Sequence, residues 1–348
     1  MRKEIRIGDK LIGEGHPTFV IAELSGNHNM VYERAEAILR EAKRVGADAI
    51  KLQTYRADTI TIDANGEQFR TKSNGLWAGQ TLYELYEKAY TPWEWQPRLK
   101  KLADELGIIL FSSPFDETAV DFLEEIGICA YKIASYEIND IGLIRRCAIT
   151  GKPIFFSTGI ANENDIDLAI QTCLDIGNDK IILLKCTSEY PAPYEHMNLL
   201  TIPYMKEKYD CIVGLSDHSL GDEVAIGAVA LGATVIEKHL TMKRTDGGVD
   251  SSFSIEPEEM GSMIYKIHNI ERALGKPIID AEGSNNENKG RSLYVVKSIK
   301  KGELITKDNV KSIRPGYGLH TKYYDEVLGK KASRDLEYAK PLEWRDFE

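Results

Sequence analysis

Several features that mark well-known protein classes are missing from this chain of 348 residues. Its five cysteines form no C-x-x-C pair and are odd in number, which argues against a zinc ribbon, a dithiol redox motif and a disulfide framework. No apolar run is long enough to cross a membrane, and the first residues lack the apolar stretch of a signal peptide. Positive net charge is also missing, because 54 acidic and 44 basic residues leave a charge of −10. We therefore expect a reduced, cytoplasmic protein that binds neither membranes nor nucleic acid.

Two diagnostic glycine motifs are missing as well. No G-x-G-x-x-G follows the first expected strand, which disfavours an open dinucleotide-binding sheet, and no G-x-S-x-G marks a nucleophilic serine. The chain instead has short apolar runs that end in polar or ionisable residues and alternate with helical patterns. The eight expected strands are 18–22, 49–53, 108–112, 131–134, 153–157, 180–185, 211–215 and 234–238. A parallel strand buried on both faces is nearly all apolar, so polar residues at every carboxyl end indicate a functional site.

The regular order of strand and helix predicts a (β/α)8 TIM barrel over residues 1–280, with an open doubly wound sheet as the alternative. The carboxyl ends of the strands would then meet at one mouth and form the active site. A long connection, residues 54–90, interrupts the order, and connections of that length are usually functional. The polar stretch 281–290 is typical of a linker, and residues 291–348 of a small β-rich domain.

Two histidines end neighbouring strands of the expected barrel. His218 and His239 can share one divalent cation there and leave positions open for water or substrate oxygens. Two hydrogen-bonded histidines are the alternative interpretation. Asp217 and Glu237 lie beside them in sequence, and strand alternation is expected to turn both away from the mouth.

Lysines occur inside four otherwise apolar strands: Lys51, Lys132, Lys185 and Lys238. Buried lysines are rare unless they are paired, so one explanation is a separate Lys–Glu pair at each site. As a group at one mouth, they predict a cationic pocket for a phosphate or a carboxylate, even in an acidic protein. A Schiff-base lysine, as in aldolases, is a further alternative.

Hydroxyl and carboxylate side chains occupy the same strand ends. The hydroxyls add donors that suit a phosphate, although each alone is more often a turn or cap residue. They are Ser113, Ser135, Ser157, Thr158, Ser188 and Ser216. Glu23 and Glu137 follow two of the strands and are candidates to hold a substrate hydroxyl or to move a proton.

These strand ends resemble the sialic acid synthase family along nearly the whole chain. The matching motifs are AELSGNHN (22–29), KLQT (51–54), SSPFD (112–116), YKIASYE (131–137), STG (157–159), KCTSEYP (185–191), GLSDHS (214–219) and EKHLT (237–241). The tail IKKGELITKDNVKSIRPGYGL (299–319) is similar to the antifreeze-like (SAF) domain that ends these enzymes. The resemblance implies a cytoplasmic transferase that condenses phosphoenolpyruvate with an amino-sugar aldose to form a nonulosonic acid and phosphate.

Two motifs resemble one branch of the family in particular. The opening AELSGNHN and the segment 75–95 are similar to the pseudaminic acid branch, which implies 2,4-diacetamido-2,4,6-trideoxy-L-altrose as the acceptor. A synthase of the same chemistry that makes N-acetylneuraminic or legionaminic acid remains an alternative, as does a non-catalytic carbohydrate-binding protein.

The resemblance also implies roles for individual residues. His218 and His239 match the ligands of a divalent metal, usually manganese, with cobalt or magnesium as alternatives. The positions that match phosphoenolpyruvate contacts are Lys51, Lys132, Ser135, Ser157, Ser188 and Ser216. Those that match pocket residues, sugar contacts or acid–base groups are Gln53, Glu137, Glu23, Tyr190 and Asp250. Arg314 matches an arginine that the SAF domain inserts into the partner subunit's active site, which implies a homodimer.

Overall fold

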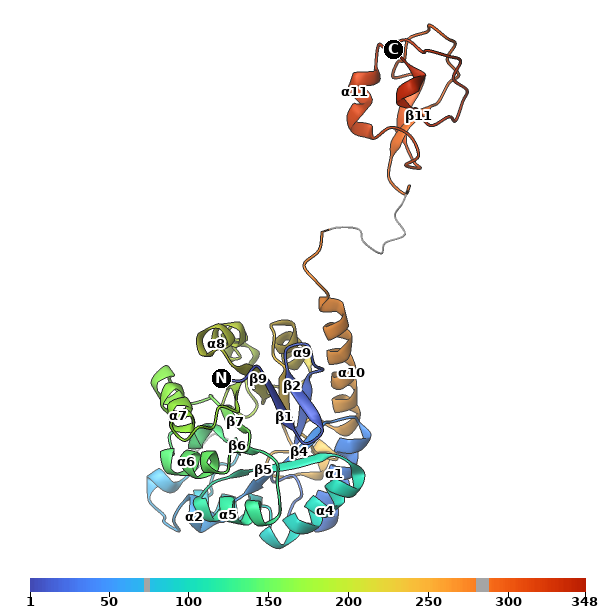
Figure 1. The fold of residues 1–348 in the computed structure, drawn as a ribbon. Helices are drawn as coiled ribbons and strands as arrows, with labels where there is room; N and C mark the ends of the chain where they lie inside the picture. Colours follow the sequence, from blue (N-terminus) through green and yellow to red (C-terminus); the bar gives the residue numbers. More distant parts are fainter. Residues whose placement is uncertain (72–75, 280–287) are drawn as a thin grey trace. The chain divides into compact units, whose positions relative to one another are not determined.

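The computed structural model describes residues 1–71, 76–279 and 288–348 (Figure 1). It divides into two compact units, Met1–Gly275 and Lys276–Glu348, each with its own core. The predicted linker, 281–290, falls mainly outside the described residues, so its bounds stay a prediction. No helix within the described ranges is long and apolar enough to cross a membrane.

The first unit is a closed barrel of eight parallel strands in the order β10-β3-β4-β5-β6-β7-β8-β9. The strands are β3 Phe19–Glu23, β4 Ala49–Thr54, β5 Ile109–Pro114, β6 Tyr131–Ile133, β7 Ile154–Ser157, β8 Ile181–Cys186, β9 Ile212–Asp217 and β10 Val235–His239. The prediction of a (β/α)8 barrel is therefore confirmed, and the open sheet is wrong. Closure brings His239 of β10 into register with Glu23 of β3, the first barrel strand.

Helices surround this barrel (Figure 1). They are α1 Tyr32–Arg44, α4 Gln96–Leu106, α5 Glu117–Glu125, α6 Ile141–Ile149, α7 Glu163–Asp175, α8 Thr201–Tyr209, α9 Glu223–Ala230 and α10 Pro257–Leu274. Local sequence sets their ends: Asp116 caps α5 by accepting from the amides of Thr118 and Ala119, and Gly107 ends α4 at φ 66°. The long connection carries α2 Ala57–Ile60, the turn η1 Glu67–Phe69 and α3 Leu82–Ala89, and the turn η2 Trp93–Trp95 follows it. The remaining turns of the barrel unit are η3 Ser135–Glu137, η4 Tyr194–His196 and η5 Arg244–Asp246.

A two-stranded hairpin precedes the barrel and was not foreseen from the sequence. Its strands are β1 Glu4–Ile7 and β2 Lys10–Gly13. Ile5, Ile7 and Ile12 are fully buried and share one apolar cluster with Phe19 and other residues inside the barrel. Each such side chain contributes roughly 1.5–3 kcal/mol by leaving water. The hairpin thus packs against the amino-terminal ends of the strands, opposite the polar mouth.

The second unit is small and β-rich, as predicted. It contains the antiparallel strands β11 Ser292–Val295 and β12 Val310–Ile313, the short helix α11 Tyr324–Val327, and the turns η6 Thr321–Tyr323 and η7 Trp344–Asp346. Its core gathers Leu293, Val295, Ile305, Val310 and Leu336, all at most 1% exposed.

Candidate active site

Two of the four strand lysines point into the barrel. Lys51 Nζ lies 2.5 Å from a carboxylate oxygen of Glu23, and Lys132 Nζ donates to both carboxylate oxygens of Glu237, at 2.8 and 3.0 Å. All four side chains are at most 4% exposed. Two buried ammonium groups therefore lie at the mouth, each neutralised by a carboxylate.

The other two lysines point outward, so the prediction of a four-lysine cluster is wrong. Lys185 follows Leu184 of the inner core, and alternation turns its side chain to the outer face, where it binds the Thr187 hydroxyl. Lys238 Nζ donates to Asp217 Oδ2 at 2.6 Å and to the carbonyl of Ser219 at 2.7 Å. The outward direction expected for Asp217 is confirmed.

Glu237 is a central residue of the site that the sequence interpretation placed on the wrong face. Residues two apart on a strand share a face, so Glu237 points inward with His239. It accepts from Lys132 and from Ser216 Oγ at 3.0 Å, and Lys51 Nζ is 3.9 Å away. Burial opposes its ionisation, but Lys132 and Lys51 lower the pKa of Glu237 to about 2. Its charge therefore persists in the buried mouth.

A second network joins predicted residues through one that was missed. Glu23 Oε1 accepts from the Ser25 amide at 3.0 Å and from Gln53 Nε2 at 3.1 Å, and Gln53 also donates to Ser25 Oγ at 3.2 Å. Ser25 Oγ donates to Asp250 Oδ2. Ser25 therefore links three residues that come from β3, β4 and the loop after β10. Its position inside the SGNHN turn was the available signal.

Neighbouring His28 of that turn has a structural role. Its ring packs edge-on to Trp95 at 5.4 Å, and its Nδ1 accepts from the Met30 amide. Burial and Arg34 lower the pKa of His28 to about 4, so the imidazole stays neutral in the core.

Hydroxyl groups gather at the carboxyl ends of β6, β7 and β8. Ser188 Oγ donates to Ser135 Oγ at 2.8 Å, and Ser135 Oγ accepts from the Ile160 amide at 3.0 Å. A Cβ on Gly159 would overlap both hydroxyls, so this close approach of backbone and side chains requires glycine. Ser157 Oγ is buried without a hydrogen-bond partner in the described structure. Ser135, Ser157 and Ser188 form a hydroxyl cradle, which offers hydrogen-bonding groups to an anion.

The two histidines lie side by side at the mouth, with ring centroids 5.3 Å apart. His218 Nδ1 lies 2.9 Å from the carbonyl of Thr187, which assigns the proton to Nδ1 and leaves the Nε2 lone pair free. His239 Nδ1 is buried without a hydrogen-bond partner among the described residues, 3.8 Å from Asp250 Oδ2. Burial and the surrounding cations hold the pKa of His239 well below its usual value, so its imidazole is neutral.

This donor set fits a divalent metal with open coordination positions. Neutral imidazoles with unused lone pairs are metal ligands. Among residues 1–71, 76–279 and 288–348, no three or more His, Cys, Asp or Glu side chains are grouped to hold an ion. An ion bound by His218 and His239 would therefore take its remaining ligands from water or substrate.

Aromatic rings pack against both histidines. Tyr190 lies 4.5 Å from His218 between ring centroids, and Phe253 lies 4.9 Å from His239 and 5.2 Å from Tyr190. Tyr190, predicted as a sugar contact, is thus placed at the mouth.

Glu137 lies in η3, after β6, and its Oε2 is buried without a hydrogen-bond partner in the part of the chain that the structure describes. Burial raises the pKa of Glu137 to about 7, with a further contribution from Asp140 and opposition from Lys132. A carboxyl group with this pKa can accept or donate a proton near neutral pH.

Arg314 belongs to the second unit and is exposed. The loop that carries it is fixed by Ser292, whose Oγ donates to the Pro315 carbonyl and accepts from the Gly318 amide, both at 2.8 Å. A Cβ on Gly318 would overlap the carbonyl of Leu293, which explains glycine at this turn.

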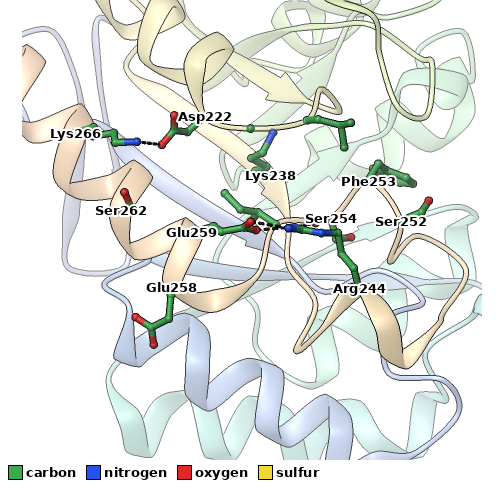
Figure 2. A pocket seen from close by; sticks show the side chains of 13 residues that line it. Asp222, Lys238, Arg244, Ser252, Phe253, Ser254, Glu258, Glu259, Ser262 and Lys266 are labelled. Atoms are coloured by element: carbon green, nitrogen blue, oxygen red, sulfur yellow. Dashed lines mark hydrogen bonds and ion pairs between the residues drawn. The ribbon is translucent and has the colours of Figure 1, made fainter.

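A cavity of about 640 Å³ lies beside the mouth, on the outer face of β10 (Figure 2). Outward-facing Lys238 lines it, four of its other charged side chains form two ion pairs, and Glu258 pairs with Arg44 outside it. Figure 2 shows Lys266 with Asp222 and Arg244 with Glu259, both pairs at 2.6 Å. The cavity therefore lacks the inward-facing groups of the mouth, which remains the candidate site.

Fold and mouth together define a (β/α)8 barrel protein whose strand ends gather buried Lys–Glu pairs, hydroxyls and two histidines. The chain belongs to the NeuB family, which residues 38–278 match, and residues 290–348 match the SAF domain. The resemblance inferred from the strand-end motifs and the tail is confirmed.

Curated relatives and solved structures match along most of the chain. Pseudaminic acid synthase of Campylobacter jejuni is 45% identical over 94% of this chain and 96% of its own length. N,N'-diacetyllegionaminic acid synthase of Legionella pneumophila is 34% identical, with 98% of each chain covered. The crystal structure of the spore coat polysaccharide biosynthesis protein SpsE of Bacillus subtilis matches with a TM-score of 0.68 and 31% identity, covering 99% of both chains.

Proposed function

We propose that this protein is an enzyme that makes pseudaminic acid from phosphoenolpyruvate, water and 2,4-diacetamido-2,4,6-trideoxy-L-altrose, with release of phosphate. The observation that carries the proposal is one mouth that joins Lys51 and Lys132, a hydroxyl cradle, and the adjacent pair His218 and His239. The acceptor rests on the higher identity to a pseudaminic acid synthase, 45%, than to a legionaminic acid synthase, 34%.

The anionic substrate suits the inner lysines and the cradle. Phosphoenolpyruvate carries a phosphate and a carboxylate, and ammonium and hydroxyl donors bind both groups. Lys51 and Lys132 supply ammonium N–H donors, and Ser157 has a buried hydroxyl with no partner among the described residues. Glu237 holds Lys132 in place from the opposite side of the barrel.

His218 and His239 would hold the metal, for which we propose manganese, with cobalt or magnesium as alternatives. When bound, such an ion supplies a Lewis acid that polarises the aldehyde oxygen of the acceptor. Asp250, whose pKa is raised by burial, lies beside His239 and can give a proton to that oxygen.

The proposed reaction forms one carbon–carbon bond and breaks the C2–O bond to the phosphate. C3 of phosphoenolpyruvate forms a bond to the aldehyde carbon, and the aldehyde oxygen takes up a proton to become a hydroxyl. Water adds to C2 and loses a proton to a carboxylate, for which we propose Glu137, with Glu23 as the alternative. The bond between C2 and the phosphate oxygen then breaks with its electron pair on phosphate, the C2 hydroxyl becomes the product carbonyl, and the hydroxyl proton is released with the phosphate.

Glu137 gives this scheme a pH signature. As a base it works only when ionised, so kcat/KM should rise with pH through about 7, where its pKa lies. Glu137→Gln should remove this acidic limb and lower kcat by about 10²–10⁴-fold, the usual range for general acid–base catalysis. The measurement is phosphate release against pH for both proteins. An unchanged limb in the variant would assign the titration to another group.

The proposed function is tested by phosphate release with manganese and three acceptors: the trideoxy altrose sugar, its legionaminic counterpart and N-acetylmannosamine. We expect turnover with the altrose sugar alone. Turnover only with another sugar would keep the chemistry and replace the acceptor. Sugar binding without phosphate release would favour the non-catalytic carbohydrate-binding alternative.

A Schiff-base aldolase is disfavoured by the state of the lysines. Lys51 and Lys132 are ion-paired rather than free amines, and Lys185 faces away from the mouth. Borohydride in the presence of pyruvate should therefore trap no adduct.

We further propose a cytoplasmic homodimer in which Arg314 of one subunit enters the other subunit's mouth. Arg314 is exposed on a loop that hydrogen bonds of Ser292 hold in place, which supports this role. The cysteines of the described chain are free, which supports a reducing compartment. The expected result is complementation: Arg314→Ala and His239→Ala are each inactive, but mixed subunits regain activity. Random pairing predicts about a quarter of the wild-type sites active. No recovery after subunit exchange is confirmed would contradict action in trans.

A further inference from the structure

The long connection between β4 and η2 brings one tryptophan to the mouth. Trp77 lies 5.5 Å from Tyr190 between ring centroids, and Tyr190 contacts His218 and Phe253. The other two tryptophans of this region pack elsewhere: Trp93 stacks on Phe122 at 4.8 Å, and Trp95 lies edge-on to Tyr32 at 5.7 Å.

Hydrogen bonds fix Trp77 and leave its ring faces apolar. Its indole Nε1 donates to the Val249 carbonyl at 2.8 Å, next to Asp250. Its own carbonyl accepts from Thr71 Oγ1 at 2.7 Å, which anchors the base of the loop. Because the only polar atom of the indole is already bonded, the ring presents hydrocarbon surface.

We infer that Trp77, with Tyr190 and Phe253, forms an apolar wall that selects the acceptor sugar by its methyl groups. This inference rests on the proposed function and names a specificity residue for it. The trideoxy acceptor carries a C6 methyl and two acetamido methyls, whereas N-acetylmannosamine has a single acetamido methyl and a C6 hydroxyl. The wall contacts both histidines, which the proposed function places beside the acceptor aldehyde, so we assign it to the acceptor rather than to phosphoenolpyruvate.

The expected selectivity is moderate, because an apolar pocket gains about 10–200-fold from one added methyl and rejects a hydroxyl-bearing analogue by about a hundredfold. Trp77→Ala should therefore raise KM for the trideoxy acceptor about tenfold or more and leave KM for phosphoenolpyruvate within about twofold. Its preference for the trideoxy sugar over the same sugar with a C6 hydroxyl should fall by a similar factor.

Two further variants distinguish the effect of the apolar ring face of Trp77 from the effect of its hydrogen bond to Val249. Trp77→Phe keeps an aromatic face and loses the bond to Val249, so it should retain most of the preference. Trp344 is an exposed tryptophan of the second unit. Trp344→Ala is therefore the matched control and should behave as the wild type does.

The outcomes are distinguishable. A wild-type protein without phosphate release on any acceptor would overturn the proposed function and this inference together. A functional wild type whose Trp77→Ala variant keeps the same acceptor preference would overturn the inference alone. Equal loss of preference in Trp77→Phe and Trp77→Ala would also overturn it, because the hydrogen bond rather than the ring face would then be responsible.

Discussion

His239→Ala is expected to lower kcat/KM for phosphate release by about a thousandfold or more, because Lewis-acid stabilisation of developing charge contributes several kcal/mol. The fold should persist, since His239 Nδ1 has no hydrogen-bond partner in the described chain and the ring lies at the mouth. The measurement combines phosphate release with manganese binding followed by electron paramagnetic resonance. Loss of both, with an unchanged melting temperature, is the expected result.

His268→Ala provides the control for this variant. His268 is on α10, is half exposed and pairs with Glu271 at 2.9 Å. It should bind manganese and turn over as the wild type does. Wild-type activity of His239→Ala after removal of metal would contradict the metal role of the pair.

The strand-end pattern predicted the barrel and its mouth because it depends only on local hydrophobicity. Gln53 is two residues after Lys51, so the two side chains share one face of β4, and both contact Glu23. The direction of each side chain, into or out of the barrel, was predicted less well, because inward and outward positions on a strand differ by a single residue. Counting back two residues from His239 would have placed Glu237 inside the barrel, and counting back one would have placed Lys238 outside.

The spacing of residues along the sequence could not predict long-range contacts. Ser25 and Asp250 are 225 residues apart and meet only because β10 closes on β3. The amino-terminal hairpin had a visible signal, since Glu4 to Ile7 alternates charged and apolar residues and Gly8 follows. A run of four residues is too short to stand out from a loop, and its packing on the barrel interior is a tertiary effect.

The second large effect is expected at Glu237. Glu237→Gln should lower the free energy of unfolding by about 3–5 kcal/mol, because removing one partner of a buried ion pair leaves the other charge uncompensated. Lys132 loses its carboxylate, whereas Lys51 keeps Glu23. The activity should fall about a hundredfold, since a small displacement of Lys132 misplaces the bound substrate. Urea unfolding and phosphate release measure the two effects.

Glu14→Gln is the matched control, the same substitution in an exposed pair with Lys206 at 2.7 Å. Its stability should change by less than about 1 kcal/mol. Equal losses in the two variants would show that the buried pair has no special role.

Acid and phosphate give Glu237→Gln a specific signature. The folded pKa of Glu237, about 2, lies below its ordinary value of 4.5. Its ionisation therefore stabilises the wild type above pH 4.5, and this stability is lost as pH falls from 4.5 towards 2. The variant should lack that acid-dependent loss.

Added phosphate should raise the melting temperature of the variant more than that of the wild type, because it supplies the missing negative charge beside Lys132. Equal shifts in both proteins would place Lys132 outside the anion site.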